Sequence, residues 1–336
     1  MTRTIIIAEA GVNHNGRMNL ARKLVDVAAT AGADFIKFQA FKSRNLVTRN
    51  LDKANYQKKS GRPLESQYEM LKKLELSQDE LTELFTYCVK KKIGFMASAF
   101  DQESLRFILN MDIEYLKIPS GEITNIPYLR LVGRKNKKVI LSTGMSDINE
   151  IKMAVKVLRK SGLAKKNLTI LHCNTEYPTN FSDVNLNAMK TLESKFQTQV
   201  GYSDHTKGSH VSIAAVALGA SLIEKHLTLN KRLKGPDHSA SLEPKEFIKF
   251  VESIRTTEEI LGSHQKKPTE SEIRNINHAR KVIVASKSIS KGEKFDLKNT
   301  TVKRAGKGLS PIHWDEVIGS RAKKDYRADQ KISILN

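Results

Sequence analysis

The chain has 336 residues, two cysteines and a formal net charge of +21 at pH 7, and this length suffices for one large domain of roughly 250 residues and a second, small one. Two cysteines are too few for a disulfide framework and favour a reducing, cytoplasmic setting, while no apolar run reaches the roughly 20 residues of a membrane span. Because the lysines are dispersed and are not interleaved with aromatic residues, we expect a solvated basic surface that helps to gather small anions, with no nucleic-acid or membrane partner.

Short β-branched runs alternate with amphipathic stretches along the first three quarters of the chain. The expected strands are residues 4–8, 35–39, 94–98, 115–118, 139–142, 169–172, 199–202 and 222–224. The expected helices are residues 20–31, 79–92, 105–110, 126–134, 148–161, 186–196, 209–218 and 244–261. Eight strand–helix units over roughly 260 residues are typical of an α/β protein with a (β/α)8 TIM barrel, rather than of an open doubly wound sheet.

Two regions depart from this alternation. The connection 41–77 is far longer than the roughly two to six residues of a typical βα loop, so we expect a lid or a wall of the substrate site. After the barrel domain, 1–262, a polar and partly helical linker is expected at 263–278, followed by a small domain at 279–336. In that domain we expect strands at 282–285 and 331–335, and we expect it to pack on a partner surface because it is marginal alone.

The carboxyl ends of barrel strands carry the chemistry of this fold, and two histidines occupy adjacent ends. His205 and His226 follow successive strands, so their neutral imidazoles could bind one divalent transition metal. We expect Asp204 and Glu224 beside them as supporting carboxylates. The alternative is a loop histidine and a hydrogen-bonded core histidine.

Lysines on two other strands point to an anionic ligand. Lys37 and Lys117 are predicted to face the barrel interior, where a lysine is costly to desolvate unless it meets an anion. The alternatives are a Schiff-base nucleophile or a structural ion pair with Glu9 or Glu122, and each glutamate is accordingly either a general acid/base or the partner of a lysine. Further hydrogen bonds to the same anion could come from the hydroxyls of Ser98, Ser120 and Ser203.

Eight motifs occur in a recognisable order: IAEAGVNHNG, IKFQ, KIPSGEITN, LSTGM, LHCNTEYPT, GYSDHT, IEKHLT and GPDHSASLEP. In these motifs the chain resembles the sialic acid synthases, which are phosphoenolpyruvate-dependent synthases of N-acetylneuraminate and related nine-carbon sugars. The resemblance covers the barrel and continues into the tail, where VKRAGKGLS is similar to the family's antifreeze-like SAF domain of the β-clip type. It implies that phosphoenolpyruvate condenses with an N-acetylmannosamine-type aldehyde and water, and that phosphate is released by C–O cleavage.

The resemblance also implies roles for individual residues. It implies a divalent metal, Mn²⁺ with Mg²⁺ or Co²⁺ as alternatives, on His205 and His226. It implies a catalytic Glu122 that stabilises the developing cation and takes a proton from water, supported by Glu9. Thr175 stands where the family often has asparagine. The residues that match the phosphoenolpyruvate-binding positions are Lys37, Ser98, Lys117, Ser120, Ser203 and Thr175, and those that match the sugar-binding positions are Gln39, Tyr177 and Asp237.

A homodimer is the last implication of the resemblance. In the family the SAF domain of one subunit covers the barrel mouth of its neighbour, and Arg304 matches the arginine that reaches the sugar. The segment PSGEITN resembles that of neuraminate and legionaminate synthases, which argues against the alternative of a pseudaminic acid synthase. The resemblance implies that the choice of acceptor sugar depends on the long connection around residues 55–67. A Schiff-base aldolase and a non-catalytic basic protein that binds phosphorylated ligands or polyanions are the competing hypotheses from other classes.

Overall fold

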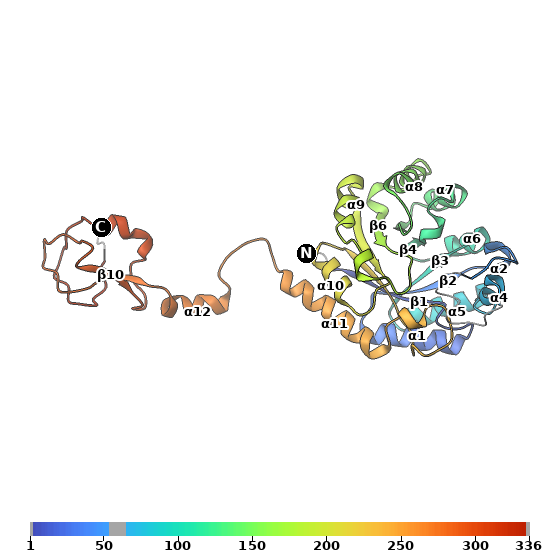
Figure 1. The fold of residues 1–336 in the computed structure, drawn as a ribbon, viewed down its shortest axis with the longest axis horizontal. Coiled ribbons are helices and arrows are strands. Elements are labelled where there is room, and N and C mark those ends of the chain that lie inside the picture. The colour runs from blue at the N-terminus through green and yellow to red at the C-terminus, as the bar shows by residue number, and fades with distance from the viewer. Residues whose placement is uncertain (1–2, 54–64, 334–336) are drawn as a thin grey trace. The chain divides into compact units, whose positions relative to one another are not determined.

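The structure is a computed structural model that describes residues 3–53 and 65–333 (Figure 1). The chain divides into two compact units, Met1–Gly262 and Ser263–Asn336, which we describe separately. Most of the segment 55–67, on which acceptor choice was expected to depend, lies outside the described residues. None of the helices in the described ranges has both the length and the apolar character needed to span a membrane.

The first unit is a closed barrel in which each of eight parallel strands pairs with the next and β8 pairs with β1. Helices surround it on the outside, as Figure 1 shows, so the predicted TIM barrel is confirmed. The strands are β1 (Ile5–Gly11), β2 (Phe35–Ala40), β3 (Gly94–Ala99), β4 (Tyr115–Ile118), β5 (Lys138–Ser142), β6 (Leu168–Cys173), β7 (Gln199–Asp204) and β8 (Leu222–His226). The outer helices are α1 (Met18–Ala31), α5 (Gln78–Lys90), α6 (Gln102–Asn110), α7 (Ile126–Lys135), α8 (Ile148–Lys160), α9 (Ala188–Phe196), α10 (His210–Ala217) and α11 (Pro244–Leu261).

Local sequence signals define where these helices begin and end. The Ser77 hydroxyl accepts a hydrogen bond from the backbone N–H of Glu80, whose carboxylate accepts one from the N–H of Ser77, and this capping box starts α5. At the other end of a helix, α1 stops at Gly32, whose φ of 79° lies in the left-handed region that favours glycine. The connecting segments hold short 3₁₀ helices: η1 (Ser120–Glu122), η2 (Lys165–Asn167), η3 (Phe181–Asp183) and η4 (His238–Ala240).

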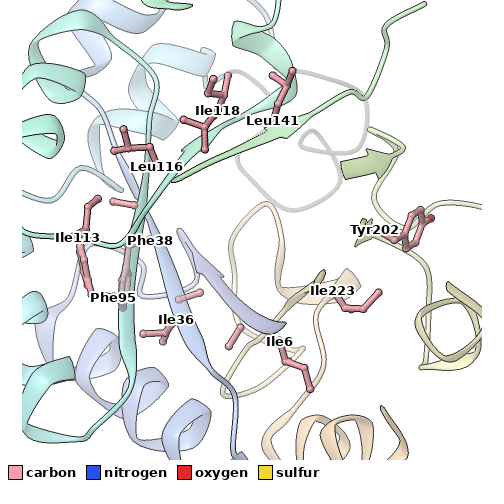
Figure 2. Packing of buried hydrophobic residues seen from close by; sticks show 14 of the residues in the cluster. Ile6, Ile36, Phe38, Phe95, Ile113, Leu116, Ile118, Leu141, Tyr202 and Ile223 are labelled. Atoms are coloured by element: carbon pink, nitrogen blue, oxygen red, sulfur yellow. The ribbon is translucent and has the colours of Figure 1, made fainter. Parts of the chain in front are cut away.

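The core of the first unit has two parts, separated by the strands. Alternate strand residues, among them Ile36, Leu116 and Ile223, pack against the helices in one continuous cluster, part of which Figure 2 shows. Their neighbours fill the barrel interior with an apolar plug of Ile7, Phe35, Met96, Ile140, Leu171 and Leu222. Because side chains alternate along a strand, the residues two positions beyond this plug again face the interior, nearer the carboxyl ends. That layer holds the charged residues.

The long connection after β2 contains two short helices, α2 (Ser43–Leu46) and α4 (Gln67–Lys72). It forms a hydrophobic cluster of its own, in which the buried Val12, Phe41, Met70 and Leu74 are packed by the partly buried Leu46, Leu71 and Phe100. The connection is therefore a packed substructure over its described part.

The second unit has a small core of its own around Ile283, Ile289, Phe295 and Val317. Its elements are α12 (Glu270–Ala279), β9 (Val282–Ala285), β10 (Thr300–Lys303), η5 (Pro311–His313) and α13 (Trp314–Val317), with β9 and β10 antiparallel. The sequence did not predict β10. Where we expected a strand at 331–335, Lys331 makes a single bridge to Val284 within the described residues.

Candidate active site

A cavity of about 460 Å³ opens at the carboxyl ends of the barrel strands. The residues predicted to bind or act on the substrates, apart from Glu122 and Arg304, line it: Glu9, Lys37, Gln39, Ser98, Lys117, Ser120, Thr175, Tyr177, Ser203, His205, His226 and Asp237. Arg304 belongs to the second unit, where it follows β10 and is exposed.

The floor of the cavity is a buried layer of two lysines and two glutamates. The Lys37 Nζ lies 2.7 Å from Glu9 Oε2 and 3.6 Å from Glu224 Oε2. The Lys117 Nζ donates to both carboxylate oxygens of Glu224, at 2.8 and 2.7 Å. Glu224 therefore contacts both lysines. The alternative of an ion pair with Glu9 holds for Lys37, whereas the pairing of Lys117 with Glu224 was not predicted, because Glu224 was expected to support the histidines.

Hydroxyl groups surround this charged layer. Ser98 Oγ accepts from Lys37 Nζ at 3.1 Å, and Ser203 Oγ donates to Glu224 Oε1 at 2.9 Å. Ser120 Oγ accepts a hydrogen bond from the backbone N–H of Gly144 at 3.0 Å and lies 3.3 Å from Cys173 Sγ, in a contact where either atom could be the donor. The floor thus combines two cations with several hydroxyl donors, which is the combination that binds phosphate or carboxylate oxygens.

Burial and neighbouring charge give the three carboxylates of the cavity different pKa values. Desolvation raises the pKa of Glu9, which Lys37 only partly opposes. Burial acts the same way on Glu224, but Lys117 and Lys37 hold its pKa well below the usual range. Burial, aided by the charge of Glu9, raises the pKa of Asp237 to about 7. At neutral pH Glu224 is therefore ionised, whereas Asp237 is poised to gain or lose a proton.

Glu9, Gln39 and Asp237 converge at Gly11. A Cβ on Gly11 would lie 3.2 Å from Glu9 Oε1, 3.5 Å from Gln39 Nε2 and 3.6 Å from Asp237 Oδ2, and the φ of Gly11 is +50°. Glycine therefore gives the backbone conformation and the space that bring these three polar groups together.

The two histidines face each other above the floor. The ring centroids of His205 and His226 lie 5.4 Å apart, and the Tyr177 ring lies 4.2 Å from that of His205. His205 Nδ1 donates to the carbonyl of Asn174 at 2.5 Å, so its Nε2 carries a lone pair, while His226 Nδ1 is buried without a hydrogen-bond partner in the described part of the chain. Burial lowers the pKa of His205 to about 4 and the pKa of His226 well below its usual value.

Neutral imidazoles with an available nitrogen suit a divalent metal, and the carbonyl that orients His205 is typical of metal-ligating histidines. The residues present therefore fit two protein ligands of a metal ion. Over residues 3–53 and 65–333, no group of three or more His, Cys, Asp or Glu side chains is arranged to hold one.

The expectation that Asp204 supports the histidines is wrong. Asp204 Oδ2 lies 3.0 Å from Lys225 Nζ, and both side chains are 0% exposed. Ser203 and His205 line the cavity, so Asp204, which lies between them on β7, points to the opposite side of the barrel wall. There it also accepts hydrogen bonds from Thr206 and Ser212.

Glu122 does not line the cavity, although it was predicted to be catalytic. It lies on η1, and its carboxylate accepts a hydrogen bond from Asn125 Nδ2 at 2.6 Å. The 3₁₀ turn after β4 places Ser120 and Gly121 on the cavity surface and directs the carboxylate of the next residue away from it. Burial raises the pKa of Glu122.

Residues 24–266 match the NeuB family, and residues 280–333 match the SAF domain. The chain belongs to the NeuB family. The N,N'-diacetyllegionaminic acid synthase of Campylobacter jejuni is 49% identical over 332 residues, which are 99% of this chain and 99% of that protein. The pseudaminic acid synthase of the same species is 33% identical over 97% of this chain and 94% of that protein. The crystal structure of the N-acetylneuraminic acid synthetase of Leptospira borgpetersenii has a TM-score of 0.72 and 38% identity, and the match covers 82% of this chain and 90% of that one.

The family assignment confirms the resemblance read from the motifs, and the SAF match confirms the predicted type of the second domain. Sequence reasoning missed two features of this NeuB-family cavity. One is the pairing of Glu224 with both lysines. The other is a set of apolar residues that line the cavity and belong to one hydrophobic cluster: Val12, Leu46, Met70, Leu71 and Phe100. The unusual length of the connection after β2 was the only feature of the sequence that pointed to them.

Proposed function

We propose that the chain is an enzyme that condenses phosphoenolpyruvate with an N-acetylated mannosamine-type aldehyde and water, giving a nine-carbon nonulosonic acid and phosphate by C–O cleavage. The observation that carries the proposal is the meeting of two buried lysines, several hydroxyls and a pair of neutral histidines in one cavity of a NeuB-family chain. We propose N,N'-diacetyllegionaminate as the product and N-acetylneuraminate as the second candidate. Identity of 49% to a legionaminic acid synthase, against 33% to a pseudaminic acid synthase, disfavours the pseudaminate alternative.

Phosphoenolpyruvate would bind on the floor of the cavity. Its phosphate and carboxylate oxygens would be held by Lys37 and Lys117, with further hydrogen bonds from the lining residues Ser98, Ser120, Ser203 and Thr175. Glu224 keeps both ammonium groups in place, so little side-chain order has to be gained when the anion arrives.

His205 and His226 would hold a divalent metal, Mn²⁺ in preference to Mg²⁺ or Co²⁺. When bound, the metal supplies Lewis-acid polarisation of the aldehyde oxygen of the acceptor. Gln39, Tyr177 and Asp237 line the same cavity and would orient the acceptor by hydrogen bonds.

Carboxylates would handle the charge and the proton that follow carbon–carbon bond formation. Positive charge then develops at the phosphate-bearing carbon, and water adds there before phosphate leaves. We propose Glu122 as the group that stabilises this cation and takes the proton, after a side-chain rotation away from Asn125 into the space beside Gly121, and Glu9 as the supporting carboxylate. Burial raises the pKa of Glu122, which makes its carboxylate a stronger base toward the attacking water.

The second unit would complete the site in a homodimer. In this proposal the SAF domain of one subunit covers the barrel mouth of its neighbour, and Arg304 of that domain hydrogen-bonds the sugar while the cover excludes water. An independent core in the second unit and an exposed Arg304 support this arrangement. Two free cysteines, Cys88 and Cys173, support a cytoplasmic location.

The competing hypotheses predict different chemistry. A basic protein that only binds phosphorylated ligands or polyanions would bind them in a salt-sensitive way without releasing phosphate. A Schiff-base aldolase would be trapped by borohydride in the presence of pyruvate and would ignore chelators. Against the effect of burial, Glu224 and Glu9 raise the pKa of Lys37, so this amine stays charged and non-nucleophilic, which disfavours it as a Schiff-base residue.

The test is phosphate release from phosphoenolpyruvate with N-acetylmannosamine or 2,4-diacetamido-2,4,6-trideoxymannose, each with Mn²⁺ and with a chelator. We expect metal-dependent release that is faster with the diacetamido sugar. Absence of release with either sugar would refute the proposal, and release that is unaffected by chelation would refute its metal component.

A further inference from the structure

One wall of the cavity is apolar, and neither anion binding nor the histidine pair accounts for it. Its residues come from the β1–α1 connection, from the end of β3 and from the long connection after β2. They are Val12, Leu46, Val47, Met70, Leu71 and Phe100, and we call them the apolar wall. The wall lies beside a floor made of charged and hydroxyl groups, so the cavity has two chemically distinct surfaces.

The apolar wall is held in a defined position. Its members other than Val47 belong to one packed hydrophobic cluster, in which Val12 and Met70 are buried. Two carboxylates hold the start of α2 in place. The backbone N–H of Lys42 donates a hydrogen bond to Asp101, which follows β3, at 2.8 Å, and the N–H of Ser43 donates one to Glu75, near the end of the connection, at 2.7 Å. A wall anchored in this way can discriminate between ligands by shape and polarity.

Leu46, Val47, Leu71 and Phe100 are the members that remain partly exposed, and the first three of them are aliphatic. The exposed carbons of Leu46, Val47 and Leu71 line the cavity. A ligand that covers them with apolar groups gains free energy by removing apolar surface from water, and a ligand with only polar groups does not. Among the described residues that line the cavity, the two lysines are both on the floor and both paired with glutamate. The side chains of the wall therefore offer no cation to a phosphate and no strong hydrogen bond to a buried hydroxyl, and the polar residue that the described part of the long connection contributes to the cavity is Gln67 at the start of α4.

We infer that Leu46, Val47 and Leu71 determine acceptor specificity by binding methyl groups of the sugar. They favour a deoxygenated, multiply acetylated acceptor over one that presents a free hydroxyl or a phosphate to the apolar wall. The inference rests on the proposed function, because it concerns the acceptor of the same reaction. One methyl group in an apolar pocket typically changes relative specificity by roughly tenfold or more.

Two substitutions make the wall polar with little change in volume or helix propensity. Val47→Thr replaces a methyl by a hydroxyl, and Leu71→Gln keeps a good helix former in α4. Val89→Thr is the matched control, because Val89 is 62% exposed on α5 and does not line the cavity. The measurement is kcat/KM for phosphate release with 2,4-diacetamido-2,4,6-trideoxymannose and with N-acetylmannosamine.

We expect the wild-type chain to prefer the diacetamido sugar, and each wall variant to lower that preference by roughly tenfold. The KM for phosphoenolpyruvate should stay unchanged, which shows that the floor is intact, and Val89→Thr should behave as wild type. An unchanged preference in both wall variants with a normal KM for phosphoenolpyruvate would overturn the inference while leaving the proposed function in place. Failure of the wild-type chain to release phosphate with either sugar would instead overturn the proposed function, and the inference with it.

Discussion

Substitution of Lys225 by methionine tests the buried ion pair behind the two histidines. Lys225 Nζ lies 3.0 Å from Asp204 Oδ2, both side chains are 0% exposed, and the ammonium also donates to the carbonyl of Thr206 at 2.6 Å. Lys225→Met would leave the Asp204 carboxylate buried without its counter-charge. Breaking such a pair typically costs about 3–5 kcal/mol. Because Asp204 keeps hydrogen bonds from Thr206 and Ser212, we expect a loss near the lower end, about 3 kcal/mol.

A double-mutant cycle separates this charge effect from lost packing. Asp204→Asn alone should also destabilise the barrel, and the double variant Lys225→Met/Asp204→Asn should lose about 2 kcal/mol less than the sum of the two single losses, which is the coupling between the two side chains. Urea unfolding followed by far-ultraviolet circular dichroism reports mainly on the barrel helices. Trp314 is the single tryptophan of the chain and lies in the second unit, so its fluorescence reports on that unit separately from the circular dichroism of the barrel.

The ion pair also has a consequence for metal binding. Asp204 and Lys225 directly precede His205 and His226 on β7 and β8. We therefore expect calorimetric Mn²⁺ titration of folded Lys225→Met to show affinity lowered by roughly tenfold. The reasoning would be refuted if each single variant lost less than about 1 kcal/mol, or if the losses in the double variant were simply additive.

Three further predictions concern the cavity and the second domain. Glu122→Gln should bind phosphoenolpyruvate with unchanged affinity in calorimetry but lose roughly a hundredfold or more in kcat; a wild-type rate would rule out Glu122 as the base. A variant that ends at Gly262 should keep the far-ultraviolet spectrum of the barrel yet be nearly inactive in the phosphate-release assay, and full activity would exclude a lid role for the SAF domain. The folded-state pKa of Asp237, about 7, lies above its ordinary value of 3.8, so the folded chain binds the extra proton and Asp237 makes stability fall as the pH rises between these values. Asp237→Asn should flatten the dependence of urea midpoints on pH over that range, and an unchanged slope would contradict the raised pKa.

The alternation of residues along the strands was sufficient to predict much of the site. Because side chains alternate between the two faces of a strand, the sequence placed Lys37 two positions beyond the apolar plug residue Phe35 and put it on the same interior face. The positions of His205 and His226 at successive strand ends predicted that they would meet, and their rings do lie 5.4 Å apart. The eight strand–helix units likewise predicted the barrel from local patterns alone.

The partners of these side chains depended on how the barrel closes. Lys117 and Glu224 are 107 positions apart, on β4 and β8, and only a closed barrel brings those two strands to opposite sides of one small interior. Local sequence contains no information about that distance, so the lysines could not be assigned to Glu224 in advance. Glu122 illustrates the same limit on a smaller scale, because a single 3₁₀ turn decided whether its carboxylate faced the cavity or Asn125.

The sequence by itself therefore determined the fold, the family and the set of chemical groups at the strand ends. Tertiary structure alone decided which carboxylate neutralises which lysine, that Asp204 pairs with Lys225 outside the barrel, and that a packed hydrophobic cluster forms one wall of the cavity. The physical reason is that backbone periodicity sets the face on which a side chain emerges, whereas its contacts depend on strands and loops that are distant in the chain and meet only when the barrel closes.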